Sequence, residues 1–266
     1  MSTIIYPSPI FGPIHSRRLG VSLGINLQPA DGKSCTFDCL YCECGLNAER
    51  RTSTRRPALE EVVSALECKL REMKAAGEAL DVLTFAGNGE PTTHPQFPEI
   101  IAETARLRDE YYPAAKVSVL SNATMIHREN VREALMTVDN NILKLDTVNM
   151  AYINLVDRPQ QKFYDVRAVI EDMKRFEGHC IVQTMFMTGE VAPQSADNQS
   201  VSVDNTGEEY VAPWLEALLE IRPQQVMIYT IDRETPVRGL RKASPETLDK
   251  IRDRVKALGI ECTASY

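Results

Sequence analysis

Three cysteines in one short segment are the residues of this chain best suited to chemistry. Cys35, Cys39 and Cys42 follow one another with three and then two residues between them. Thiolates are ligands for zinc and for iron-sulfur clusters, and a closed site of either kind normally takes four protein ligands. Three thiolates on a four-iron cluster leave one iron open to an external molecule. The spacing therefore predicts a cluster with an exchangeable ligand, and we call residues 35–42 the cysteine segment.

A fourth thiol, Cys44, keeps a zinc site open as the alternative. Zinc sites usually pair two ligand turns that lie far apart in the sequence, and a Cys-x-Cys step strains a tetrahedron within one loop. The spacing favours the cluster, and it assigns no role to Cys44.

A glycine-rich turn, residues 87–91, is the second candidate motif, with the sequence Gly87-Asn88-Gly89-Glu90-Pro91. Glycine permits unusual backbone dihedrals and close approach of another group, and Glu90 offers a carboxylate to a cation. Alone, such a turn is a weak signal. We call it the glycine turn.

Segments typical of strands and helices alternate along the chain, and these elements must position both motifs. Predicted strands cover residues 19–27, 81–86, 116–121, 141–146, 179–186 and 225–231. Predicted helices cover residues 57–76, 95–110, 127–138, 164–177, 208–221 and 245–257. This alternation requires parallel strands with right-handed crossovers and outer helices. We expect an α/β fold, a closed or partly open barrel, with its site at the carboxyl ends of the strands.

Further polar residues fall at the ends of later predicted strands. Ser121 and Asn122 can bond hydroxyl groups, and Lys144 can pair with a carboxylate, although it can equally pair with Asp146. The pair Arg17 and Arg18, together with Arg233, could hold an anionic substrate or close the barrel with salt bridges.

We expect one domain over residues 1–266, with a core at about 18–235 and a C-terminal helix and tail at 236–266. The polar stretch 188–207 predicts a surface loop or lid. The chain has 266 residues, 43% of them hydrophobic and 25% charged, which indicates a globular protein with a full core.

The net charge and the cysteines indicate which partners and which cellular compartment suit the chain. The net charge of -7 argues against a large nucleic-acid footprint but leaves room for a local basic patch. An odd count of seven cysteines, three with metal-ligand spacing, indicates a reducing compartment, and we expect Cys68, Cys180 and Cys262 to be buried. The sequence has no long apolar stretch or signal-like start, so we expect a cytoplasmic protein with no membrane contact.

With Phe37, Tyr41 and the glycine turn, the cysteine segment resembles that of the radical S-adenosylmethionine (radical SAM) superfamily. The resemblance implies a partial (β/α)6 barrel and one [4Fe-4S] cluster held by Cys35, Cys39 and Cys42. It also implies that the open iron chelates S-adenosylmethionine and that Tyr41 packs beside the adenine. The glycine turn would bind the methionyl ammonium, with Asn88 in place of the usual glycine. Ser121, Asn122, Lys144 and Asp146 would serve the ribose and the methionyl carboxylate.

The resemblance further implies the reaction. An electron from a flavodoxin or ferredoxin reduces the cluster, S-adenosylmethionine is cleaved, and a 5'-deoxyadenosyl radical abstracts hydrogen from a substrate that the sequence does not identify. Residues 11–26, 144–146 and 229–236 look like the group of iron-sulfur oxidoreductases related to wyosine-base synthases. Candidates for a catalytic role are Lys144, Asp146 and Arg233.

Three alternatives remain open. Wyosine-type tRNA modification is disfavoured because no cysteine precedes Cys35 to hold a second cluster and because the chain is acidic. A glycyl-radical-enzyme activase would share the three-cysteine spacing but not the segments at 16–20 and 229–233. A non-catalytic iron-sulfur electron carrier would have no use for the glycine turn.

Overall fold

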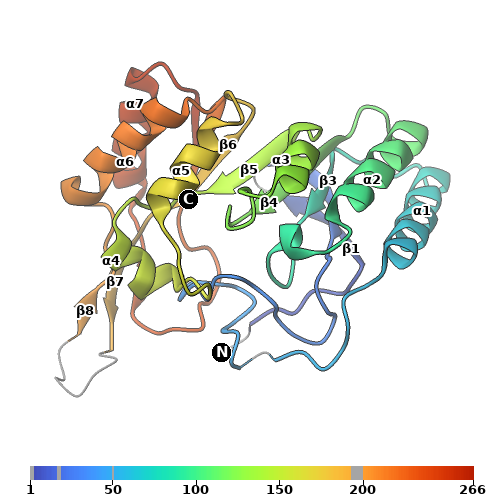
Figure 1. Cartoon of the computed structure of the whole chain (residues 1–266), viewed down its shortest axis with the longest axis horizontal. Coiled ribbons are helices and arrows are strands. Elements are labelled where there is room, and N and C mark those ends of the chain that lie inside the picture. Colours follow the sequence, from blue (N-terminus) through green and yellow to red (C-terminus); the bar gives the residue numbers. More distant parts are fainter. Residues whose placement is uncertain (1–2, 17–18, 50, 193–199) are drawn as a thin grey trace. The chain divides into compact units, whose positions relative to one another are not determined.

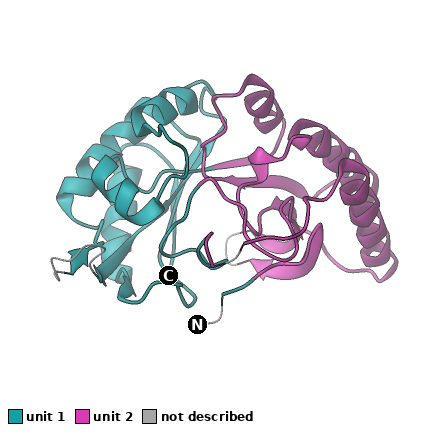
Figure 2. Ribbon diagram, turned by 60° about the horizontal axis from the view of Figure 1, so that its bottom comes forward, with its two compact units in different colours: residues 1–4, 37–46, 143–266 teal, residues 5–36, 47–142 magenta. Residues whose placement is uncertain are grey.

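The computed structural model describes residues 3–16, 19–49, 51–192 and 200–266. The chain forms two compact units, which Figure 2 colours separately. The N-terminal unit comprises residues 5–36 and 47–142, and the C-terminal unit comprises residues 1–4, 37–46 and 143–266. The chain therefore changes unit twice around the cysteine segment.

The N-terminal unit is built on a sheet with the strand order β1-β2-β3-β4. These strands are β1 (Ile10–Ser16), β2 (Gly20–Ile25), β3 (Val82–Phe85) and β4 (Lys116–Ser121). β1 pairs antiparallel with β2, whereas β2, β3 and β4 are parallel. Because parallel strands share one carboxyl edge, the segments after Ile25, Phe85 and Ser121 leave the sheet on the same side.

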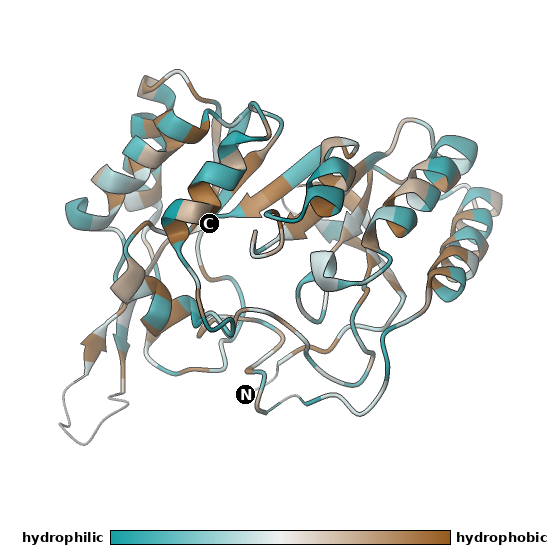
Figure 3. Cartoon of the chain, viewed as in Figure 1, coloured by the Kyte–Doolittle hydropathy of each residue, from teal (hydrophilic) through white to brown (hydrophobic). Residues whose placement is uncertain are grey.

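Helices α1 (Leu59–Ala75), α2 (Phe97–Tyr111) and α3 (Glu129–Met136) and a short 3-10 turn, η1 (Pro91–Thr93), complete this unit. α1 packs against α2, and α2 against α3 (Figure 1). α1 buries Val62, Leu66, Leu70 and Met73, one per turn, and Figure 3 shows hydrophobic and hydrophilic residues alternating along this helix.

The C-terminal unit contains a parallel sheet with the order β6-β9-β11, formed by β6 (Ile181–Met185), β9 (Gln225–Tyr229) and β11 (Cys262–Ser265). β5 (Asn140–Lys144) enters the unit with its last two residues. The helices are α4 (Met150–Tyr152), the π-helix η2 (Ile153–Asp157), α5 (Val166–Lys174), α6 (Glu208–Ile221) and α7 (Pro245–Ala257). A small antiparallel sheet has the order β10-β7-β8, formed by β10 (Leu240–Lys242), β7 (Met187–Val191) and β8 (Val201–Ser202).

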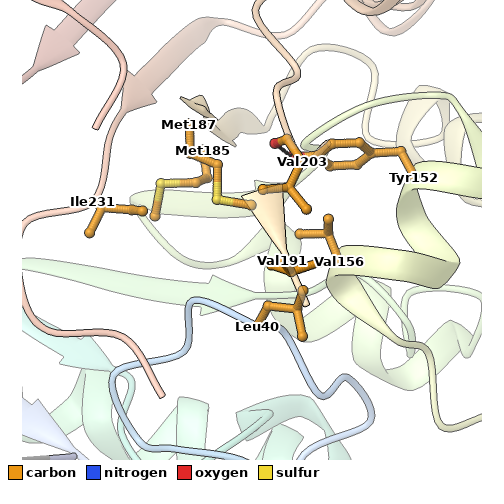
Figure 4. Close-up of a cluster of buried hydrophobic side chains, with 8 residues drawn as sticks. All are labelled: Leu40, Tyr152, Val156, Met185, Met187, Val191, Val203 and Ile231. Atoms are coloured by element: carbon orange, nitrogen blue, oxygen red, sulfur yellow. Dashed lines mark hydrogen bonds between the residues drawn. The ribbon is translucent and has the colours of Figure 1, made fainter. Parts of the chain in front are cut away.

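A hydrophobic cluster of the C-terminal unit includes a residue of the cysteine segment. Figure 4 shows this cluster, which is made of Leu40, Tyr152, Val156, Met185, Met187, Val191, Val203 and Ile231. Leu40 is 1% exposed, so the residue between Cys39 and Tyr41 is anchored by burial. Elsewhere in this unit the single tryptophan, Trp214, is also buried; its indole N–H donates to the Leu145 carbonyl at 3.1 Å and its ring meets Phe186 edge-on.

The structure confirms the alternation predicted from the sequence, with element ends displaced by a few residues. It also adds strands that were not predicted, namely β1, β7, β8, β10 and β11. Part of the predicted loop at 188–207 is β7 and β8, and its residues 193–199 lie outside the described part of the chain. The expectation that Cys68 is buried was wrong, because Cys68 lies on the exposed side of α1. Among the described residues, no helix is both long enough and apolar enough to cross a membrane.

Candidate active site

The three cysteines with ligand spacing are chemically suited to a metal cluster. Cys35, Cys39 and Cys42 are free of disulfides and partly exposed, whereas Cys44 is only 4% exposed. A thiol that is reachable can take up iron, and a buried one is a poor partner for assembly. This donor set fits a three-thiolate cluster better than a four-thiolate zinc site. In the described part of the chain, no three His, Cys, Asp or Glu side chains are gathered closely enough to form a ready metal site.

In the C-terminal unit, residues 37–42 of the cysteine segment are hydrogen-bonded to the end of η2. The N–H of Asp38 donates to the carbonyl of Asp157 at 2.9 Å, and the N–H of Leu40 donates to that of Val156 at 2.9 Å. The ring of Phe37 meets Tyr164 edge-on, with 5.3 Å between the ring centroids. Backbone bonds and ring packing thus fix the residues around Cys39.

A buried charged cluster lies beside this segment in the same unit. Lys144, at the end of β5, contacts Tyr41 and Asp146 and forms an ion pair with Asp157 at 3.0 Å. Tyr41 in turn donates its hydroxyl hydrogen to Asp146. The side chains of Asp146 and Asp157 are 2% and 3% exposed, and that of Lys144 is 14% exposed. The Lys144 ammonium also lies 4.9 Å from the centre of the Tyr41 ring, close enough for a cation–π contact.

Burial and neighbouring charge shift the pKa of these groups. Burial raises the pKa of Asp157 to about 7, against the opposing effect of Lys144. Burial would lower the pKa of Lys144, but the attraction of Asp146 and Asp157 outweighs it, so the net direction is upward. Lys144 is therefore charged at neutral pH and shared between two carboxyl groups.

In the N-terminal unit, Glu90 joins the ends of β3 and β4. Its Oε1 accepts hydrogen bonds from the N–H of Thr92 at 3.1 Å and the hydroxyls of Thr92 and Ser121, and its Oε2 accepts from the N–H of Asn122 at 2.6 Å. Burial raises the pKa of Glu90, while these hydrogen bonds favour its charged form. Oε2 accepts one of these hydrogen bonds, and a carboxylate oxygen can accept a second.

The rest of the glycine turn is packed against the residue that precedes Cys35. Ser34 donates its N–H to the Asn88 carbonyl at 2.9 Å and pairs with Gly89 in a parallel bridge. The Asn88 side chain is fully buried; its amide nitrogen donates to the carbonyls of Tyr6 and Pro29. Asn88 therefore has a structural task in this chain.

Asn122 contacts Cys35 and Thr36, the first two residues of the cysteine segment. Its amide nitrogen lies 2.8 Å from the Thr36 hydroxyl and 3.6 Å from the Cys35 sulfur, and its amide oxygen accepts from Thr124. The Thr36 and Thr124 hydroxyls are themselves hydrogen-bonded at 2.7 Å. The end of β4 is thus connected to the first cysteine within one unit.

Of the three arginine candidates, the structure describes Arg233. Arg233 forms an ion pair with Glu43 at 2.7 Å within the C-terminal unit, and both side chains are nearly half exposed. The pair Arg17 and Arg18 lies outside the described residues.

Sequence reasoning missed Asp157, Thr36 and Thr124. Asp157 is the last residue of a π-helix, and the hydrophobic periodicity of the sequence does not predict that helix. Its ion-pair partner, Lys144, lies 13 residues earlier in the chain. Thr36 lies inside the cysteine segment, and its hydroxyl group could have marked it as a hydrogen-bonding residue of the site. Thr124 follows Asn122 at the spacing of a side-chain-to-backbone turn, which is a readable pattern.

The family model described as "Radical SAM superfamily" matches residues 31–193, a range that contains the cysteine segment and the glycine turn. A protein named "GTPase Obg" from Brachyspira hyodysenteriae is 26% identical over 93% of this chain, but the chain spans only 33% of that protein. A "UPF0026 protein" from Helicobacter pylori is 28% identical over 91% of this chain and 72% of its own length.

Solved structures share the fold at low identity. A radical SAM methyltransferase from Sphaerobacter thermophilus matches with a TM-score of 0.63 and 16% identity, covering 92% of this chain and 66% of that one. Streptococcus suis SuiB bound to S-adenosylmethionine gives 0.60 and 15%, covering 91% and 50%. TYW1 with a lysine-pyruvate adduct bound gives 0.61 and 12%, covering 89% and 73%. These likenesses confirm the fold class expected from the sequence, an α/β partial barrel with parallel strands and outer helices.

Proposed function

The chain belongs to the radical SAM superfamily, and we propose that it holds one [4Fe-4S] cluster on Cys35, Cys39 and Cys42 and uses it on S-adenosylmethionine. Membership of this superfamily supports an enzyme that uses S-adenosylmethionine, an iron-sulfur cluster, a reductant and a substrate. A reduced cluster held by these three cysteines, together with S-adenosylmethionine, would supply a 5'-deoxyadenosyl radical able to abstract hydrogen from the substrate.

The observation that carries the ligand assignment is the contrast among the four thiols of residues 35–44. Three are partly exposed and form no disulfide, and the fourth, Cys44, is only 4% exposed. This contrast supports three protein ligands and an open iron, and it disfavours the zinc alternative.

For the methionyl ammonium we propose the glycine turn. Burial raises the pKa of Glu90, and the hydrogen bonds that its carboxyl group accepts oppose that rise. Its Oε2 has room for a further donor. For Ser121 the observed bond to Glu90 favours a positioning task over direct contact with the ribose.

Lys144 and Asp146 stay candidates for cofactor contact, but their geometry favours a role in positioning Tyr41. Both contact the hydroxyl of Tyr41, the aromatic residue that the family places beside the adenine. We propose that they hold this ring in place. Two carboxyl groups already balance the Lys144 charge, so it is a weak partner for the methionyl carboxylate.

We also propose that the two units act together as the single domain expected from the sequence. We further propose that a flavodoxin or ferredoxin is the electron donor. For Arg233, a role in holding an anionic substrate stays a prediction, and its ion pair with Glu43 would have to open first.

The test is anaerobic reconstitution of the full chain with iron and sulfide. We expect about four irons per chain, an electron paramagnetic resonance (EPR) signal that changes on adding S-adenosylmethionine, and 5'-deoxyadenosine after reduction. Cys35→Ala, Cys39→Ala and Cys42→Ala should each abolish the signal, whereas Cys68→Ala, on the exposed side of α1, should not. Bound zinc, or a cluster indifferent to S-adenosylmethionine, would refute the proposal.

Substrate classes can then be separated with the same preparation. Deuterated candidate metabolites should pass their label into 5'-deoxyadenosine if they lose hydrogen to the radical. Pyruvate with methylguanosine-containing tRNA forms one arm of this screen, because these are the substrates of the alternative wyosine-type reaction. A protein that carries the cluster but makes no 5'-deoxyadenosine would be an electron carrier instead.

A further inference from the structure

We propose that Asn122 sets the reduction potential of the cluster by donating a side-chain N–H hydrogen bond to the sulfur of Cys35. This inference rests on the proposed function, because it requires that Cys35 hold the cluster. It gives Asn122 a positioning and tuning role in place of the ribose contact expected from the sequence.

The direction of the Asn122 amide is determined by its other partners. The backbone N–H of Thr124 can only donate, and it points to the atom assigned as Oδ1 at 3.1 Å. If the amide were flipped, two donors would face each other there, so the oxygen must lie on that side. The nitrogen therefore faces Thr36 at 2.8 Å and the Cys35 sulfur at 3.6 Å, one hydrogen for each.

Asn122 is also held rigidly before any cluster binds. Its backbone N–H donates to Glu90, and the next residue, Ala123, has a φ of 64°, a left-handed conformation that alanine rarely adopts. The N–H of Ala123 donates to the Ser121 hydroxyl at 3.1 Å, and Ala123 is 1% exposed. Strained backbone of this kind persists only where the surroundings over-determine it, and it often occurs at functional sites.

The effect on the potential follows from charge. Reduction adds one electron to a cluster whose negative charge spreads over its sulfur ligands. An N–H donor at a ligand sulfur stabilises the reduced state more than the oxidised state, so it raises the reduction potential. Asn122 is only 9% exposed, so water competes little for its hydrogen. The residue thereby makes the cluster easier to reduce by a physiological donor.

The test compares midpoint potentials, measured by EPR-monitored redox titration of the anaerobically reconstituted full chain. Asn122→Ala and Asn122→Leu should both lower the midpoint. Asn47→Ala is the matched control, because Asn47 donates to the backbone carbonyl of the same Cys35 at 3.2 Å. Its midpoint should equal that of the unaltered protein, with the same iron content.

A second measurement applies if the Asn122 variants do not assemble a cluster. In Asn47→Ala protein carrying 15N in its asparagine side chains, pulsed EPR of the reduced cluster should detect coupling to a 15N nucleus. Absence of that coupling overturns the inference, as do equal midpoints in Asn122→Ala and the unaltered protein. If the unaltered protein binds no iron-sulfur cluster, it is the proposed function that fails.

Discussion

A methyl group on Gly89 would lie 1.9 Å from the carbonyl oxygen of Ser34. Gly89 also has a φ of 141°, which side-chain-bearing residues rarely adopt. The glycine turn is therefore adapted to contact the backbone just before Cys35, and the role of its second glycine is visible without any bound cofactor.

Gly89→Ala should destabilise the protein by about 3 kcal/mol or more, because backbone strain and atomic overlap add. Gly77→Ala is the control, since Gly77 has a φ of 70° but nothing within 4 Å of the added carbon. We expect that change to cost about 1 kcal/mol. Urea denaturation of both variants measures the difference, and equal losses would mean that the close approach to Ser34 is unimportant.

Lys144→Met should destabilise the protein by about 3–5 kcal/mol, because it leaves the buried carboxyl groups of Asp146 and Asp157 without their cation. Lys174→Met removes an exposed ion pair with Glu171 and should cost less than about 1 kcal/mol. Denaturant titrations at neutral pH provide both values. A Lys144 variant as stable as the Lys174 variant would show that the buried cluster adds little.

His94 should make the protein less stable in mild acid. Its Nδ1 accepts the N–H of Gln96, so Nε2 carries the hydrogen and donates it to the Pro57 carbonyl at 2.9 Å. Burial lowers the pKa of His94 below its ordinary value of 6.5, with the Pro57 bond opposing that shift. The unfolded chain therefore binds the proton first as the pH falls.

The stabilisation is complete above pH 6.5 and is lost as the pH falls from there through the lower pKa of the folded state. His94→Gln should flatten the dependence of unfolding free energy on pH in this window. Parallel slopes for the variant and the unaltered protein between pH 7.5 and 5 would contradict this expectation.

Cysteine reactivity should differ sharply along the chain. Burial raises the pKa of both Cys180 and Cys262 to about 12, and both are nearly inaccessible, whereas Cys68 is exposed. Brief iodoacetamide treatment of the native protein at pH 8 should modify Cys68 and spare the other two, as read by peptide mass spectrometry. Treatment in denaturant supplies the fully modified reference, and rapid native labelling of Cys180 would be the contrary result.

Local sequence signals located the regular elements well. Helix α7 begins where Ser244 and Pro245 predicted, because the Ser244 hydroxyl accepts the N–H of Thr247 and proline fits the first turn. β7 and β10 were missed because their register pairs Thr188 with Arg241, far along the chain, and their exposed residues show no apolar alternation. Pairing of that kind is decided by the tertiary structure.

The same limit applies to the site. Spacing sufficed to single out Cys35, Cys39 and Cys42, since ligand geometry is local. The contact between Asn122 and Cys35 joins residues 87 positions apart, and the direction of the amide depends on Thr124. Sequence could place Asn122 at a strand end but could not tell which partner it faces.

The burial of Trp214 gives the C-terminal unit a natural optical label. Since the chain has a single indole and it lies in that unit, emission excited at long ultraviolet wavelengths reports the local melting of one half of the polypeptide alone. Circular dichroism averages over both halves, so a mismatch between the two signals would reveal whether they come apart in separate steps.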